Sequence, residues 1–134
     1  RSRGAEAAIT WRPGAALSFA GSLTYTEARS QPGDEPMRSR PKWRSGASAL
    51  WRIRPDLSLQ AAAVAVGRVP DSSVPTGAVR LGGWARLDLA IRWEAAARAA
   101  VTLAVDNALD RTYEEAVGFP SPGRRWRGGL RLRF

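Results

Sequence analysis

Apolar and polar residues alternate most clearly over residues 126–134. One side of this stretch carries Trp126, Gly128, Leu130, Leu132 and Phe134, and the other carries Arg127, Gly129, Arg131 and Arg133. Because successive side chains of a β-strand point to opposite faces, this pattern predicts a strand with one apolar and one cationic face. The cationic face would meet bulk water in a soluble sandwich and the lumen in a barrel, so this strand alone permits both folds.

Six earlier stretches show the same period of two. They cover residues 5–12, 17–26, 43–54, 57–66, 86–93 and 101–106. In 57–66 a run of alanines blurs which face is apolar, so the pattern predicts this strand without its register. The sequence therefore predicts an all-β fold of about seven antiparallel strands.

The connections between these strands alternate in length. Short turns are expected at Pro13-Gly14, at Arg54-Pro55-Asp56 and over Glu94–Arg98, and long connections over 28–41, 69–83 and 108–123. Outer-membrane barrels combine short periplasmic turns with long extracellular loops, which is this rhythm. The three long connections are thus candidate extracellular loops and the expected place for ligand contacts. Isolated acidic residues within them are interpreted as solvated: Asp34, Glu35, Asp71 and Glu114.

Aromatic residues fall near the ends of the predicted strands, on their apolar sides. Trp11, Trp51, Trp93 and Phe134 lie near the short turns, and Tyr25, Trp43 and Trp126 near the long loops. Any one of these tryptophans is equally compatible with a soluble core. Together they predict an aromatic girdle at each of the two interfaces of a membrane. The lipid of the outer membrane is therefore an expected partner.

The composition argues against an enzyme. The chain has no His and no Cys, so the commonest general base, thiolate chemistry and the usual metal ligands are missing. Carboxylates such as Glu94, Asp106 and Glu114 stand in no recognisable catalytic pair. We therefore predict no catalytic residues, no metal site and no cofactor. An outer-membrane enzyme built on a smaller barrel lacks support for the same reason.

The net charge of +9 raises nucleic acid as a partner. A soluble basic β-domain that binds single-stranded nucleic acid is the alternative hypothesis, because Arg and aromatic residues on one face could contact backbone and bases. The aromatics here lie mostly opposite the arginines, which favours no nucleic-acid partner. The face with Arg44, Arg52, Arg86, Arg92, Arg127 and Arg131 could attract anions. The favoured interpretation is that these arginines solvate the wall and pair with neighbours.

Membrane-span length and the chain's start also bear on the class. No run of about 18 apolar residues occurs, so no transmembrane helix is predicted, whereas barrel strands need only about 9 to 11 alternating residues. The chain opens Arg1-Ser2-Arg3-Gly4 without Met or a signal segment, which leads us to expect a piece of a longer protein. Seven strands would leave two open edges, so we expect the segment to be incomplete alone.

Two motifs resemble the TonB-dependent outer-membrane receptors. Residues 105–115, Val-Asp-Asn-Ala-Leu-Asp-Arg-Thr-Tyr-Glu-Glu, are similar to the family's penultimate-strand motif Asn-Leu-Phe-Asp-Lys-x-Tyr, with Ala108 and Leu109 at the Leu and Phe positions. Residues 118–124, Gly-Phe-Pro-Ser-Pro-Gly-Arg, resemble the stretch that leads into the last strand. Shorter likenesses occur at Tyr25–Arg29, Arg40–Arg44 and Gly67-Arg68.

The resemblance implies a multi-pass protein of the bacterial outer membrane that takes up a scarce nutrient, cobalamin or an iron-siderophore, with energy from the TonB complex. It implies a barrel of about 22 strands around a plug. Residues 1–134 would be the C-terminal part of that barrel, without the plug domain and the N-terminal strands. The end of the chain is similar to the signal read by the barrel-assembly machinery, with Arg127, Gly129, Leu132 and Phe134 at its defined positions.

Overall fold

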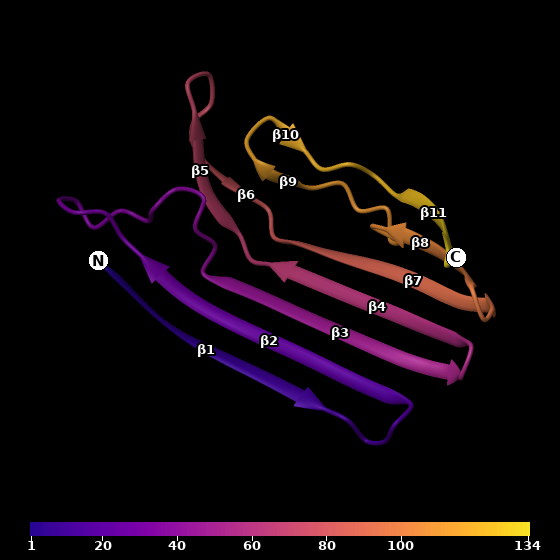
Figure 1. Cartoon of the computed structure of the whole chain (residues 1–134). Coiled ribbons are helices and arrows are strands. Elements are labelled where there is room, and N and C mark those ends of the chain that lie inside the picture. Colours follow the sequence, from indigo (N-terminus) through magenta and orange to yellow (C-terminus); the bar gives the residue numbers. More distant parts are fainter.

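The chain forms one curved antiparallel sheet with short extensions at one end. Figure 1 shows the computed structural model, which describes all residues 1–134. The seven long strands follow the order β1-β2-β3-β4-β7-β8-β11. Their bounds are β1 Ser2–Trp11, β2 Leu17–Ala28, β3 Trp43–Arg54, β4 Leu57–Val66, β7 Trp84–Ala96, β8 Ala99–Asp106 and β11 Arg125–Leu132. No helix long and apolar enough to cross a membrane is present.

The register joins the apolar sides of all seven strands into one face. Across the sheet, Leu59 pairs with Trp51 on one side and with Ile91 on the other, and Ile91 continues to Leu103. We call this the apolar face and its reverse the polar face. The register also settles β4, because Ala61 pairs with Ala49 and Leu89 and so belongs to the apolar face. The seven predicted strands and the alternation of their faces are confirmed.

The ends of β7 and β11 differ from the sequence prediction. The run Glu94–Arg98 was expected to be a turn, but β7 continues to Ala96 and only Ala97 and Arg98 turn the chain. The backbone ladder extends there because the pairing slips between Trp93 and Ala96, which keeps Ala96 opposite Ala99. The last strand ends at Leu132, so Phe134 lies beyond it with a fully exposed side chain.

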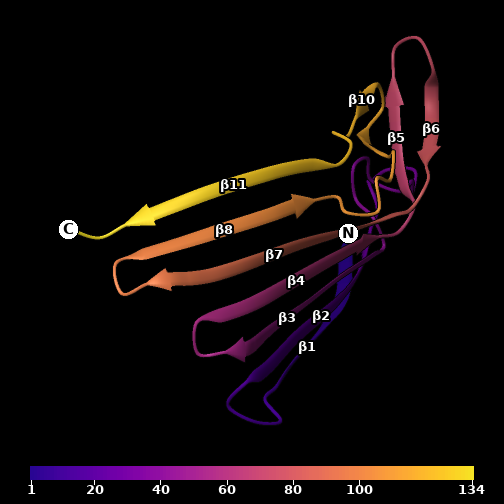
Figure 2. The same ribbon diagram turned by 90° about the vertical axis from the view of Figure 1, so that its right-hand side faces the viewer.

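The three long connections are not structureless loops. Residues 69–83 contain the hairpin β5 Val69–Ser73 and β6 Gly77–Leu81, and residues 108–123 contain β9 Glu114–Ala116 and β10 Phe119–Pro120. Residues 28–41 are closed by a bridge between Arg29 and Pro36. All three extensions stand at the same end of the sheet, which we call the loop end; the short turns form the turn end (Figure 2).

The sheet has no second layer. Only 8 of the 134 residues are buried, so the fold does not gather its apolar side chains into a core. On the apolar face large side chains stay exposed instead: Ile9, Trp11, Leu23, Trp43, Trp51, Trp93, Leu103, Leu130 and Leu132. Strands β1 and β11 each pair on one side only, so the sheet does not close on itself. The structure is the open all-β antiparallel segment that the sequence predicts.

Candidate functional site

The three extensions at the loop end are joined by one carboxylate, Asp71 of β5. Its Oδ2 accepts a hydrogen bond from the backbone N–H of Val117 at 2.9 Å, which reaches the third extension. Its Oδ1 accepts from the N–H of Ser72 at 2.8 Å and from the guanidinium of Arg38 at 3.1 Å, which reaches the first. The backbone N–H of Ser39 also donates to the carbonyl of Pro70 at 2.9 Å. We call these contacts the Asp71 clasp.

The interpretation of Asp71 as a solvated loop residue is wrong. Asp71 is only 5% exposed. The Val117 and Ser72 N–H groups and then the Arg38 guanidinium hold the pKa of its carboxyl below the usual value, against the effect of burial. Its distant partners lie 33 and 46 residues away along the chain, so a period-two pattern carries no sign of them.

Asn107 organises the turn that leaves β8. It is 2% exposed and has a φ of 51°, a left-handed conformation that Asn tolerates better than most residues. Its amide Nδ2 donates to the carbonyls of Arg111 at 2.9 Å and Pro122 at 3.3 Å, and its Oδ1 accepts from the N–H of Arg111 at 3.0 Å. The buried side chain of Asn107 thus forms its hydrogen bonds with the backbone of this turn.

Asp110 of the same motif ties the turn to the start of β11. Its Oδ1 accepts a hydrogen bond from the N–H of Arg124 at 2.8 Å. A Cβ on Gly123 would lie 3.1 Å from that oxygen, so the glycine of the second motif keeps the approach open. The two motifs recognised separately in the sequence therefore form one structural unit.

One aromatic pair on the polar face was not predicted from the sequence. Trp84 pairs in the sheet with Val66, and its ring stacks on Tyr113 with centroids 4.1 Å apart. Trp84 therefore lies on the same face as Arg86 and departs from the general separation of aromatics and arginines. Period-two alternation placed Tyr113 in a loop, so no pattern in the sequence linked the two rings.

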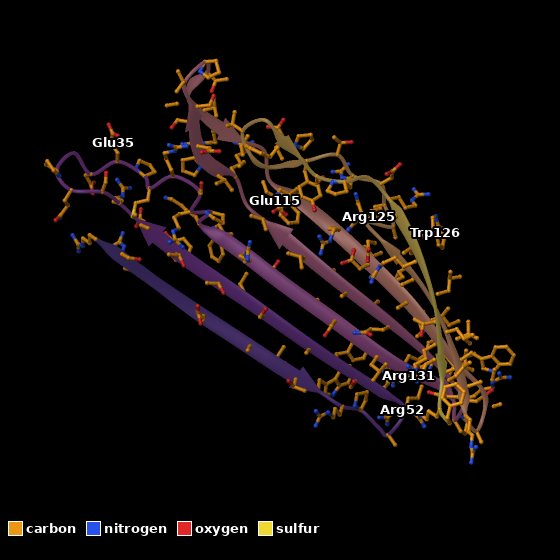
Figure 3. All side chains as sticks on the ribbon, turned by 45° about the horizontal axis from the view of Figure 1, so that its top comes forward. Glu35, Arg52, Glu115, Arg125, Trp126 and Arg131 are labelled. Carbon is orange, nitrogen blue, oxygen red and sulfur yellow. The ribbon has the colours of Figure 1, made fainter.

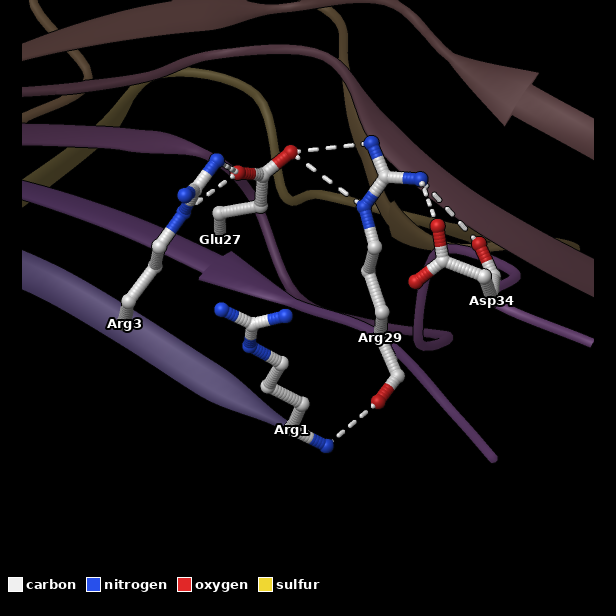
Figure 4. A pocket seen from close by; sticks show the side chains of 5 residues that line it. All are labelled: Arg1, Arg3, Glu27, Arg29 and Asp34. Atoms are coloured by element: carbon white, nitrogen blue, oxygen red, sulfur yellow. Dashed lines mark hydrogen bonds and ion pairs between the residues drawn. The ribbon is translucent and has the colours of Figure 1, made fainter. Parts of the chain in front are cut away.

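The loop end of β1 and β2 carries a cluster of ion pairs around Glu27 (Figure 4). The Glu27 carboxylate is nearly buried and contacts the guanidinium of Arg3 at 2.6 Å and that of Arg29 at 2.9 Å. The ammonium of Lys42 approaches it at 3.4 Å, and Arg29 also pairs with Asp34 at 2.9 Å. Several cations thus converge on one carboxylate, which ties β1 to β2 and to the first extension.

The six arginines singled out in the sequence share the polar face, as the register requires. Figure 3 shows Arg52 and Arg131 toward the turn end and Arg125 toward the loop end. Three of the six have acidic neighbours: Arg86 with Asp88 at 3.1 Å, Arg92 with Glu94 at 2.7 Å and Arg127 with Asp106 at 2.6 Å. The other three, Arg44, Arg52 and Arg131, pair with no acid, so pairing with neighbours accounts for only half of this set.

The residues predicted as a girdle lie in two rows on the apolar face. At the turn end Trp11 stacks on Phe19 with centroids 5.5 Å apart, and the indole N–H of Trp93 donates to Asp56 at 3.1 Å. Trp51 belongs to the same row through its pairing with Leu17. At the loop end Tyr25 and Trp43 pack with centroids 4.7 Å apart, and Trp126 is 66% exposed.

The four residues predicted to form a barrel-assembly signal lie on and beyond the edge strand β11. Arg127, Gly129 and Leu132 are in the strand, whereas Phe134 follows it.

The structure brings no three His, Cys, Asp or Glu side chains together in a group that could hold a metal ion. What the loop end offers is a set of three extensions fixed to one another by polar side chains, above a sheet with one apolar face.

Comparisons with known proteins show which family and which solved structures this chain resembles. Residues 1–108 match the family model of the TonB dependent receptor-like β-barrel. Among solved structures, the ferric enterobactin receptor of Pseudomonas aeruginosa shares 18% identity over 96% of this chain, with a TM-score of 0.80. The ferripyoverdine receptor of the outer membrane of the same organism shares 16% over 98%, with a TM-score of 0.83. The ferric-catecholate import receptor of Escherichia coli K12 shares 18% over 99%, with a TM-score of 0.85.

The chain spans 22%, 19% and 21% of these three receptors, about a fifth of each. At such identities the likeness concerns the fold, and the family follows from the model match, which covers most of the chain. The chain belongs to the β-barrel family of the TonB-dependent receptors and is part of a barrel in the bacterial outer membrane.

Proposed function

We propose that this chain is part of an active transporter that takes up a scarce nutrient across the outer membrane. The family match over residues 1–108 carries the proposal, because this family is one of receptors. The clasped extensions at the loop end support it, since a rigid barrel with ordered outer segments can present a preformed ligand site. The function we propose is transport and includes no enzymatic reaction.

The ligand we propose is a ferric siderophore, with cobalamin as the second candidate. Receptors for ferric enterobactin, ferripyoverdine and ferric catecholates resemble this chain in fold, and this favours iron. We propose that extensions 28–41, 69–83 and 108–123 supply ligand contacts from this part of the barrel. The energy would come from the TonB complex, engaged by parts of the receptor outside residues 1–134.

Growth of a deletion strain tests the function and separates the two ligands. The strain should grow poorly when iron is supplied only as a ferric siderophore, and the full-length gene should restore growth. Testing several siderophores in parallel with cobalamin-dependent growth identifies the cargo. Normal growth under every one of these conditions would contradict uptake of either ligand.

We further propose that residues 1–134 are the C-terminal part of the barrel, with the apolar face toward outer-membrane lipid and the polar face toward a plugged lumen. The two aromatic rows then form the girdles at the two membrane interfaces, because indole and phenol rings favour that depth. Small residues such as Ala49 and Ala61 on the apolar face are tolerable against lipid.

We propose that Arg127, Gly129, Leu132 and Phe134 act as a signal to the barrel-assembly machinery. The support is a single-sided edge strand, β11, which can pair with another chain by strand addition. Deleting Phe134 from the full-length receptor should lower its amount in the outer membrane while synthesis continues. Undiminished insertion would show that the terminal pattern is incidental.

The alternative, a soluble domain for single-stranded nucleic acid, is not favoured. Stacking on bases with simultaneous phosphate contact requires aromatic and cationic residues on one face. The girdle aromatics lie on the apolar face, and only the Trp84–Tyr113 pair lies with the arginines. A detergent-free soluble monomer with tight, salt-sensitive binding to oligonucleotides would favour this alternative over transport.

A further inference from the structure

A cavity at the loop end is lined by an excess of positive charge. It has a volume of about 480 Å³ and lies between the end of β2, the first extension and the hairpin β5–β6. Its cationic lining residues are Arg29, Arg40, Lys42, Arg68 and Arg80, and no Asp or Glu lines it. The neighbouring cavity at the Glu27 cluster differs, because its arginines face Glu27 and Asp34.

Two of these five cationic residues form ion pairs with an acid that does not line the cavity. Arg29 and Lys42 both contact the carboxylate of Glu27. Arg40, Arg68 and Arg80 make neither an ion pair nor a side-chain hydrogen bond, unlike Arg38 and Arg86, which also lie near the loop end. All three have exposed side chains, so their guanidinium groups are accessible from solution.

Backbone contacts and one ion pair hold these three arginines around the same cavity. The bond from Ser39 N–H to Pro70 and the Arg38–Asp71 pair draw the segment before Arg40 onto β5. Arg68 follows Gly67, whose N–H donates to the carbonyl of Trp43 at 2.8 Å. Arg80 lies directly opposite Pro70 in the β5–β6 ladder. Like charges repel, so a fold that keeps them together favours an anion between them.

We propose that Arg40, Arg68 and Arg80 form a binding subsite for a multiply charged oxyanion group, of the phosphate or carboxylate class. Guanidinium groups bind such oxygens through paired N–H donors, and three of them around one cavity fit a group with several charged oxygens. The subsite does not depend on the proposed transport function, because it would bind the anion whether or not the receptor moves it. The group can belong to a soluble molecule or to a lipid headgroup.

The test uses the purified full-length receptor and a charge-matched control. The triple variant Arg40→Gln, Arg68→Gln, Arg80→Gln is compared with Arg12→Gln, Arg98→Gln, Arg133→Gln, which removes the same charge from unpaired, exposed arginines outside the loop end. Titration with inorganic pyrophosphate in a non-ionic detergent should show binding to the wild type that weakens as salt rises. The first variant should bind about tenfold or more weakly, and the control within about twofold of the wild type.

A second arm distinguishes the source of the anion. The same three proteins are placed in vesicles of phosphatidylcholine with or without phosphatidylglycerol, and pyrophosphate binding is repeated. A lipid source predicts that phosphatidylglycerol competes with pyrophosphate in the wild type, and a soluble source predicts no competition. Equal losses in both triple variants would reduce the effect to net charge and overturn the subsite, as would the absence of binding by a wild-type receptor whose circular dichroism shows intact strands.

Discussion

The long strands of the sheet and the extensions at its loop end are held together by different forces. In the strands the backbone ladder supplies the order, and the side chains between the aromatic rows are small or apolar: Ala47, Ala49, Ala61, Ala63 and Leu89 face one way. At the loop end two buried polar side chains, Asp71 and Asn107, satisfy backbone groups of segments far apart in the sequence. The contrast teaches that a repeated alternation of side chains builds the seven-stranded sheet, which we call the wall. Single residues with specific partners hold the loop end together.

The same contrast explains how each region responds to change. A residue of the long strands is constrained by the face on which it lies, since we propose that one face meets lipid and the other the lumen. A residue of the loop end is constrained by its specific hydrogen-bond partners. A buried N–H or carbonyl that loses its partner costs free energy, regardless of the face on which it lies.

The largest effect is expected from a charge on the apolar face in the middle of β4. Ala61 lies on that face and Ala62 on the polar face, where it pairs with Asp88. Ala61→Arg should lower the free energy of unfolding by about 2–4 kcal/mol, because it places a cation in lipid near the midplane. The neighbouring Ala62→Arg should change it by about 1 kcal/mol or less.

Both variants are measured by denaturant unfolding of the full-length receptor in lipid vesicles. Equal losses for Ala61→Arg and Ala62→Arg would mean that the two faces do not have different surroundings. A larger loss for Ala62→Arg would reverse the assignment of the faces.

The second effect comes from Asn107. Asn107→Ala should lower the free energy of unfolding by about 1–3 kcal/mol, because it leaves the Arg111 N–H and the Pro122 carbonyl without their buried partner. Asn107→Asp keeps the acceptor for Arg111, but a carboxylate cannot donate to the carbonyls of Arg111 and Pro122, so this variant should lose at least as much. The same unfolding measurement applies, and an unchanged Asn107→Ala variant would remove this residue from the account.

The third effect concerns the Asp71 clasp and is local. In Asp71→Ala the amide of Val117 loses its acceptor, so its hydrogen exchange should become several-fold faster while exchange in the long strands stays unchanged. Leu57→Ala, at the opposite end of β4, serves as the control that leaves Val117 untouched. Unaltered exchange at Val117 in the Asp71 variant would contradict the clasp.

The pH dependence of the clasp follows from the lowered pKa of Asp71. Because this pKa is lower in the folded protein than in the unfolded chain, the contribution of Asp71 is complete above the ordinary Asp range, near pH 4, and is lost as the pH falls through the lowered value. After correction for intrinsic rates, Val117 should be equally protected at pH 7 and at pH 5. A loss of protection already at pH 5 would show that the carboxylate is not stabilised.

The smallest effect is expected at the turn end. Asp56 accepts the indole N–H of Trp93 at an exposed position. Asp56→Ala should lower the free energy of unfolding by about 0.5 kcal/mol or less, since water replaces an exposed partner. A loss as large as that of Asn107→Ala would mean that the turn end also depends on single polar residues, which would break the comparison.

The wall was predictable from the sequence because period-two alternation fixes both the strands and their faces. Even the Ala-rich β4 was recognised, although its register required the neighbours Ala49 and Leu89. The family resemblance was visible in two short motifs, because Asn107, Asp110 and Gly123 meet specific steric and hydrogen-bonding needs of one turn.

The loop end was less predictable because its partners are distant. The hairpin β5–β6 is only five residues on each side, too short for its alternation to stand out. The burial of Asp71 depends on Arg38 and Val117, and the stack of Trp84 on Tyr113 on the folding of the third extension. No local pattern contains these contacts, which arise only when the strands set the extensions side by side.

The central claim, a barrel wall with its extensions outside the cell, is tested most directly by labelling introduced cysteines in intact bacteria. Residues 1–134 contain no Cys, so Val74→Cys at the fully exposed tip of β5–β6 and Gly14→Cys in the β1–β2 turn can be compared in an otherwise cysteine-free full-length receptor. Gly14 has nothing within 4 Å of an added Cβ, so the change is tolerated. A membrane-impermeant maleimide should label Val74→Cys in intact cells and Gly14→Cys only after the outer membrane is opened. Labelling of Gly14→Cys but not of Val74→Cys in intact cells would contradict the account.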